Sequence, residues 1–133
     1  MSVLSFYQST DVHLESDIAA AIRIARHAAE QLGFNRTEVG YISTAAAELA
    51  SNLFVHAKNG EFGVYCSEFP PGITLQTRDD GPGIANVELA LSEGFSTAGG
   101  LGCGLPGVKR LMDNLEIQPR PEGGTVITAQ KWK

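Results

Sequence analysis

Two helical segments follow one another directly in this sequence, and the strands after them come in adjacent pairs. Residues 17–32 and 38–57 are rich in alanine and repeat apolar residues at helical spacing. Strand-like segments form two pairs, at residues 61–69 with 72–80 and at residues 114–120 with 124–132. A doubly wound parallel sheet needs strands and helices in alternation, which this order lacks. We therefore predict an α/β two-layer sandwich, with a mixed, mostly antiparallel sheet and helices on one face.

Capping residues and apolar spacing predict where the helices begin and end, and which of their residues face the core. Ser16 and Thr37 are the expected N-caps, and Gly33 suits a left-handed helix stop. Residues 3–14 are expected to form an edge strand, and residues 105–114 a later helix. The expected core-facing residues are Ile18, Ile22, Ala25 and Ala29 in the first helix, and Ile42, Ala46, Leu49 and Leu53 in the second.

Length and charge restrict the classes of function. A chain of 133 residues predicts one domain, residues 1–133, and its net charge of −5 without a basic run argues against nucleic-acid binding. We find no apolar stretch of membrane-spanning length and no signal peptide, so we expect a cytoplasmic protein without a membrane partner. Cys66 and Cys103 stand far apart, which predicts neither a metal site nor a disulfide framework.

Glu48 and Asn52 are the first pair of residues that could carry chemistry. Their spacing of four residues places them on the same face of the second predicted helix. A carboxylate can accept a proton, and an amide oxygen suits Mg²⁺, which prefers hard oxygen ligands. Taken alone, the pair is more simply interpreted as solvated side chains on a helix.

The segment "RDDGPGIAN", residues 78–86, raises a second question. Asp79 at a strand end could accept a hydrogen bond from an exocyclic amine such as adenine N6, and Gly81 and Gly83 would let a ligand lie against bare backbone, with apolar Ile84 behind them. Asp80 is the expected solvent-facing member of the aspartate pair. In isolation, a polar turn explains the same residues.

A glycine-dense segment, "STAGGLGCGLPG" at residues 96–107, runs into the later helix. Consecutive backbone amides before a helix N-terminus form an anion-binding nest, for which a triphosphate is a natural ligand. The segment lacks the G-x-x-x-x-G-K-[ST] pattern of a Walker P-loop. Further along, Thr125 enters the last strand, where its hydroxyl could contact a base or simply occupy a strand position.

The order of these weak signals resembles a known superfamily. E-x-x-x-N at Glu48–Asn52, D-x-G-x-G at Asp79–Gly83, G-x-G-L at Gly102–Leu105 and then Gly124–Thr125 resemble the nucleotide-binding boxes of GHKL ATPases, which have the Bergerat fold. The chain is similar over nearly its full length to small bacterial serine/threonine kinases of this superfamily. The run at residues 94–113 resembles the stressosome switch kinases, the RsbT family.

The resemblance implies a role for each matching residue. Asn52 would hold the Mg²⁺ that bridges the ATP phosphates, Glu48 would be the general base, and Asp79 would bind adenine with Thr125 nearby, while Gly81 and Gly83 allow close approach to the base. The phosphate-facing part of the ATP lid would comprise Gly100, Leu101, Gly102, Cys103, Gly104 and Leu105.

The resemblance also implies partners. Because the chain is too short for a phosphoacceptor domain beside the ATP domain, the acceptor would be a Ser or Thr of another protein. In the switch-kinase family this acceptor lies on STAS-domain scaffold and antagonist proteins, and the released kinase activates a PP2C-type phosphatase. One alternative is an anti-sigma factor that sequesters a sigma factor and phosphorylates its antagonist. Others are a non-catalytic switching module that uses nucleotide only to set its shape, and a domain with no ligand.

Overall fold

A computed structural model describes residues 4–57, 60–80 and 104–133 of the chain. Their strands form one five-stranded sheet in the order β1-β2-β3-β5-β4. The strands are β1 (Ser5–Val12), β2 (Gly60–Glu68), β3 (Pro71–Asp79), β4 (Asn114–Pro119) and β5 (Thr125–Trp132). Each neighbouring pair in this order is antiparallel. The first strand lies at an edge of the sheet, as the sequence predicts.

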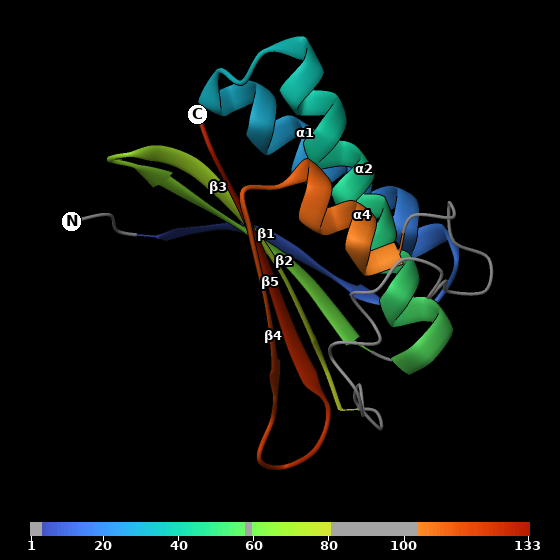
Figure 1. Cartoon of the computed structure of the whole chain (residues 1–133). Helices are drawn as coiled ribbons and strands as arrows, with labels where there is room; N and C mark the ends of the chain where they lie inside the picture. The colour runs from blue at the N-terminus through green and yellow to red at the C-terminus, as the bar shows by residue number, and fades with distance from the viewer. Residues whose placement is uncertain (1–3, 58–59, 81–103) are drawn as a thin grey trace.

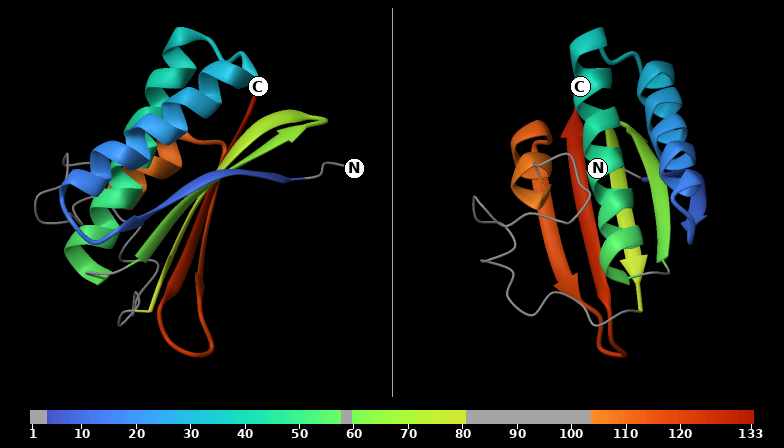
Figure 2. Two further views of the ribbon diagram at one scale, coloured as in Figure 1. Left: turned by 180° about the vertical axis from the view of Figure 1, so that it is seen from behind. Right: turned by 90° about the vertical axis from the view of Figure 1, so that its right-hand side faces the viewer.

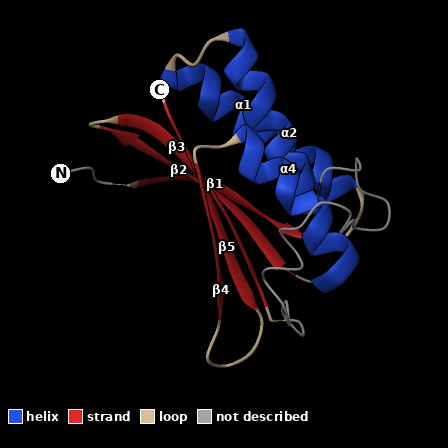
Figure 3. Cartoon of the chain, viewed as in Figure 1, coloured by secondary structure: helices blue, strands red, loops and turns tan. Residues whose placement is uncertain are grey.

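The helices of the described chain cover one face of this sheet (Figure 1; Figure 3). They are α1 (Ser16–Leu32), α2 (Arg36–Asn52), the π-helical turn η1 (Leu53–Ala57) and α4 (Gly104–Leu111). Figure 2 shows them side by side, with α1 towards β1 and β2, α2 over the middle strands and α4 towards β4. The predicted two-layer α/β sandwich is confirmed.

The core lies between the helices and the sheet. All four predicted residues of the second helix are buried, namely Ile42, Ala46, Leu49 and Leu53. In α1 the predicted residues Ala25 and Ala29 are buried, together with Ala21, Ile24 and Ala28, whereas Ile18 and Ile22 are only partly buried. Because α1 packs against α2 as well as against strands, its small alanine side chains take the most enclosed positions.

The helix starts differ from the prediction. The N-cap of α2 is Asn35, whose side chain accepts a hydrogen bond from the amide of Glu38 at 2.8 Å, while Glu38 accepts from the Asn35 amide at 3.2 Å. This reciprocal pair is a capping box, so Thr37 is not the cap. At α1 the predicted cap, Ser16, is already inside the helix.

The start of α1 is held by a carboxylate. Asp17 Oδ2 accepts hydrogen bonds from the backbone amides of His13 and Leu14, both at 2.9 Å. These two bonds lower the pKa of the Asp17 carboxyl from its ordinary value of 3.8, because they stabilise the charged form. At the other end, Gly33 has a φ of 86° and closes the helix in the predicted left-handed conformation.

Candidate active site

Glu48 and Asn52 lie at the C-terminal end of α2. Glu48 is 2% exposed and Asn52, the last residue of the helix, is partly buried. The chain then continues into η1, whose π-helical turn begins at Leu53. Short π-helical segments inside helices occur frequently at functional sites. Glu48 is therefore an enclosed carboxylate, and Asn52 stands one turn beyond it.

Gly60 connects this end of α2 with the end of β3. It is paired with Asp79 in the β2–β3 ladder. A Cβ built on Gly60 would lie 2.5 Å from Leu53 Cδ2, 2.9 Å from the Arg78 carbonyl oxygen and 3.4 Å from Asp79 Cβ. Only a residue without a side chain allows η1 to lie this close to Asp79. The geometry thus brings the Glu48–Asn52 helix and Asp79 to the same end of the sheet.

The two consecutive aspartates have opposite environments. Asp79 is 8% exposed, whereas the side chain of Asp80 is 79% exposed. Asp79 is the last residue of β3, and neighbouring side chains along a strand point to opposite faces of the sheet. Arg78 is exposed on one face, while Asp79 lies on the other face with Thr77, which is buried beneath the helices. The prediction that Asp80 faces solvent is confirmed.

The hairpin between β4 and β5 holds the end of β3. Arg120 Nη1 donates a hydrogen bond to the Asp79 carbonyl oxygen at 2.8 Å. Thr125, the first residue of β5, is 3% exposed at this same end. The hairpin closes through the Arg120 amide, which donates to the Gly124 carbonyl at 3.0 Å. Arg120 is a residue that the sequence interpretation missed. The signal in the sequence that could have indicated Arg120 is its place in the segment "RPEGGT", close to the Gly124–Thr125 pair.

The N-terminus of α4 points towards the same end of the sheet. Lys131 lies near the end of β5, and Thr125 is the first residue of that strand. The Lys131 Nζ donates a hydrogen bond at 2.9 Å to the carbonyl of Leu111, the last residue of α4. The helix packs against α2 and β4, and Figure 1 shows its N-terminal end lying towards the C-terminal end of α2. Its first residues are Gly104 and Leu105. Both residues are buried. A helix N-terminus carries a partial positive charge that favours anions.

The remaining predicted site residues lie outside the described part of the chain. They are Gly81, Gly83, Ile84, Gly100, Leu101, Gly102 and Cys103. The structure thus brings Asn52 and Glu48 on α2, Asp79 on β3 and Thr125 on β5 together at one end of the sheet, with the start of α4 directed towards them.

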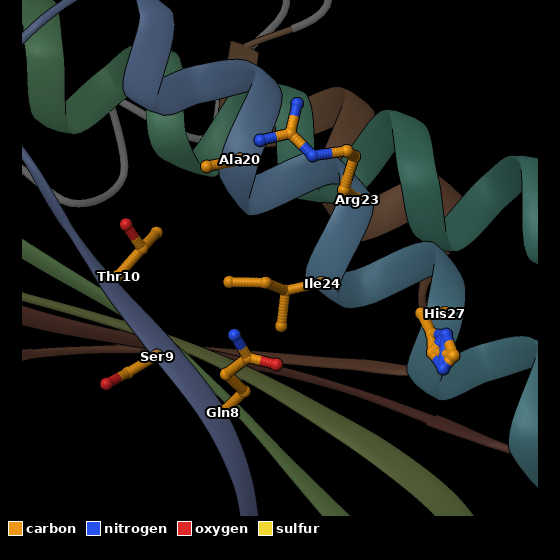
Figure 4. A pocket seen from close by; sticks show the side chains of 7 residues that line it. All are labelled: Gln8, Ser9, Thr10, Ala20, Arg23, Ile24 and His27. Atoms are coloured by element: carbon orange, nitrogen blue, oxygen red, sulfur yellow. The ribbon is translucent and has the colours of Figure 1, made fainter.

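A groove of about 390 Å³ lies elsewhere, between β1 and α1 (Figure 4). Its lining residues are Gln8, Ser9, Thr10, Ala20, Arg23, Ile24 and His27. None of the predicted nucleotide-binding residues lines it. The chemistry of the side chains, rather than the size of a cavity, therefore locates the candidate site.

The donor set at the end of α2 fits a magnesium ion held mainly by a nucleotide. Within residues 4–57, 60–80 and 104–133, no group of three or more His, Cys, Asp or Glu side chains is arranged to hold a metal. The partly buried amide of Asn52 offers one oxygen ligand. Mg²⁺ typically takes one or two protein oxygens and completes its octahedron with phosphate oxygens and water. The side chains present therefore suit a metal that arrives with its nucleotide.

Comparisons with known proteins agree with this geometry. Residues 12–131 match the family described as histidine kinase-like ATPase domain. The chain belongs to this family. It is 42% identical over 120 residues to the serine/threonine-protein kinase RsbT of Bacillus subtilis, covering 89% of this chain and 90% of the relative. The predicted resemblance to GHKL ATPases and to RsbT is confirmed, and ATP is the nucleotide that such a domain uses.

The chain is also similar to anti-sigma F factors. The protein of that name from Caldanaerobacter subterraneus subsp. tengcongensis is 30% identical over 110 residues, covering 78% of this chain and 77% of the relative. Among solved structures, the SiaB–SiaC complex of Pseudomonas aeruginosa contains a similar fold, with a TM-score of 0.65 and 11% identity over 96% of this chain and 91% of that chain. None of the helices in the described ranges is long and apolar enough to cross a membrane.

Proposed function

We propose that this protein is a serine/threonine protein kinase that transfers the γ-phosphoryl group of ATP to STAS-domain scaffold or antagonist proteins in a bacterial partner-switching pathway. We further propose that it acts in the cytoplasm as one domain, and that the kinase activates a PP2C-type phosphatase once its partner releases it. The activity agrees with the name of the Bacillus subtilis relative. The observation that carries the proposal is a buried Glu48 one helical turn from Asn52, at the end of the sheet where Asp79 lies.

In this proposal, Asp79 recognises the adenine base. Its carboxylate accepts a hydrogen bond from the exocyclic amine, and the buried Thr125 at the start of β5 lies beside the base. Gly81, Gly83 and Ile84, which follow Asp79 in the sequence, would let the base approach the backbone closely. An enclosed carboxylate selects strongly for a donor, because an unmatched ligand would leave its charge desolvated.

The phosphates would extend from the base towards α2 and α4. The α4 N-terminus and the glycine-rich residues Gly100–Cys103 before it supply backbone amides for the phosphate oxygens. Asn52 would hold Mg²⁺ through its amide oxygen, and the ion would supply positive charge that neutralises the phosphates.

Glu48 is the proposed general base. The hydroxyl oxygen of a partner Ser or Thr attacks the γ-phosphorus, the bond from that phosphorus to the leaving ADP oxygen breaks, and Glu48 accepts the hydroxyl proton. Glu48 is enclosed in the structure, with 2% of its surface exposed. Positioning and charge stabilisation supply most of the rate of phosphoryl transfer, and a general base adds typically 10²–10⁴-fold.

A phosphoryl-transfer assay tests the activity. The protein is mixed with labelled ATP, Mg²⁺ and a purified STAS-domain protein from the same organism. We expect label on a Ser or Thr of the STAS protein. Glu48→Gln should lower the transfer rate by about 10²-fold or more while ATP affinity stays close to wild type. Glu30→Gln, which removes an exposed carboxylate on α1, is the matched control and should leave transfer unchanged. Normal transfer by Glu48→Gln would refute the role of the base.

The anti-sigma F relatives favour a second candidate function, in which the protein sequesters a sigma factor and phosphorylates its antagonist. Both functions need the same kinase chemistry, so they differ in the partner alone. Size-exclusion chromatography with sigma factors of the same organism distinguishes them. A stable complex with a sigma factor would favour the anti-sigma function over the switch kinase.

A further inference from the structure

Asp79 lies one residue beyond the ladder that joins β3 to β5. The β3–β5 register ends at the pair Arg78 and Val126, while on its other side Asp79 is paired with Gly60 of β2. A buried backbone carbonyl needs a hydrogen-bond donor. For Asp79 the donor on the β5 side is the guanidinium of Arg120, at 2.8 Å. The Arg120 side chain therefore supplies the Asp79 carbonyl with a hydrogen bond at the point where the β3–β5 ladder ends.

The guanidinium of Arg120 is itself held in place. Its Nη2 lies 2.8 Å from Glu122 Oε1, and its Nε donates to the same oxygen at 3.1 Å. Its Nη1 also lies 3.6 Å from Asp80 Oδ1, and the side chain is 22% exposed. A planar guanidinium with contacts on two edges has little freedom to rotate. The direction of the donor towards Asp79 is thus set by the hairpin that carries it.

We propose that Arg120 is the positioning residue for adenine selection, because it fixes the backbone of Asp79 and thereby the direction of the Asp79 carboxylate. The inference rests on the proposed role of Asp79 in binding the adenine amine. The carbonyl carbon and the Cβ of Asp79 are bonded to the same Cα, so fixing the carbonyl limits how far this Cα, and with it the carboxylate, can shift. Arg120 acts through Asp79, without touching the nucleotide.

The proposal predicts a loss of base discrimination, which hairpin stability alone would not affect. ATP carries an exocyclic amine at position 6 of the purine, whereas ITP carries a carbonyl oxygen there and cannot donate to a carboxylate. If Arg120 only stabilised the fold, its removal would weaken binding of ATP and ITP equally. If it orients Asp79, its removal weakens ATP binding and leaves the weaker ITP binding nearly unchanged.

The test is isothermal titration of Mg·ATP and Mg·ITP into the full chain. Arg120→Met keeps most of the apolar stem and removes the donors, and we expect about a tenfold loss of ATP affinity, comparable with one charge-assisted hydrogen bond, and no change for ITP. Arg120→Lys, which restores one donor, should recover part of the ATP affinity. Arg26→Met, which removes an exposed arginine of α1, is the control for charge and should bind both nucleotides normally.

Asp79→Asn separates the two proposals. We expect it to lose ATP affinity, and we expect Arg120→Met to cause no further loss in the Asp79→Asn background, because both changes break the same interaction. If Asp79→Asn weakens ATP binding but Arg120→Met leaves it unchanged, or weakens ATP and ITP equally, the role of Arg120 is refuted alone. If Asp79→Asn binds ATP normally, the proposed role of Asp79 is wrong, and the inference falls with it.

Discussion

The backbone of Gly124 lies directly against the carbonyl group of Asp79. A Cβ built on Gly124 would overlap the Asp79 carbonyl oxygen, and would lie 2.7 Å from the Asp79 carbonyl carbon and 2.8 Å from the Asp80 Cα. The φ of Gly124, +93°, is also unfavourable for any residue with a side chain. The Gly124–Thr125 pair thus allows the last hairpin to approach the proposed adenine-binding residue.

Gly124→Ala should therefore both destabilise the fold and weaken nucleotide binding. Overpacking against backbone costs about 1–3 kcal/mol and the positive φ about 1–2 kcal/mol more. Gly123→Ala is the matched control, since Gly123 has a φ of +106° but a Cβ there would meet nothing within 4 Å. Thermal unfolding and titration with Mg·ATP check both variants. The interpretation requires Gly124→Ala to lose more stability and more ATP affinity than Gly123→Ala.

Asp79 and Asp80 should respond very differently to the same substitution. Asp79→Asn replaces an enclosed acceptor by an amide, and we expect ATP affinity to fall roughly 10- to 100-fold, as for the loss of a charged hydrogen bond. Asp80→Asn changes a side chain that is 79% exposed, so its effect should stay within about twofold. Equilibrium titration with Mg·ATP measures both, and equal losses would show that the adenine site has been misassigned.

Asn52→Ala tests the proposed metal ligand. The variant removes an oxygen donor at the end of α2 without changing charge. We expect the ATP affinity of the wild type to rise when Mg²⁺ is added, and that of Asn52→Ala to respond much less. Titrations of ATP with Mg²⁺ and with EDTA provide the measurement. The matched control is Ser51→Ala, the preceding position on the helix. An unchanged response of Asn52→Ala to Mg²⁺ would exclude Asn52 as the ligand.

The second helix begins with a capping box at Asn35, two residues before the N-cap expected from the sequence, Thr37. Asn35→Ala removes the side-chain acceptor for the Glu38 amide and should cost about 1 kcal/mol, or roughly 3–5 °C in the midpoint of thermal unfolding. Thr37→Ala, at the cap position expected from the sequence, should change stability by less than about 0.5 kcal/mol. The opposite ranking in a thermal unfolding experiment would contradict the observed cap.

The order of elements and the periodicity of α2 were enough to predict the layers, because both depend on local pattern. The asymmetry of Asp79 and Asp80 also followed from the sequence, since Asp79 fits the D-x-G-x-G pattern and Asp80 is the variable position within it. Arg120 could not be found this way. Its contact with Asp79 joins residues 41 positions apart, and only the folded hairpin brings them together. The cap of α2 was missed because Asn35 and Thr37 are both good capping residues, and the choice depends on the partner, Glu38.

The carboxylate of Asp17 should make stability depend on pH in the acid range. Hydrogen bonds from the His13 and Leu14 amides lower its pKa in the folded protein below the ordinary 3.8. A carboxyl with a lowered folded pKa stabilises the fold above its unfolded pKa, and this contribution disappears as the pH falls through the folded pKa. Asp17→Asn resembles the protonated side chain in charge and shape. We therefore expect the variant to be less stable than wild type at pH 7 and to match it at a pH well below 3.8. Urea unfolding at both pH values measures the difference, and a deficit that is the same at both would mean that the charge of Asp17 does not stabilise the start of α1.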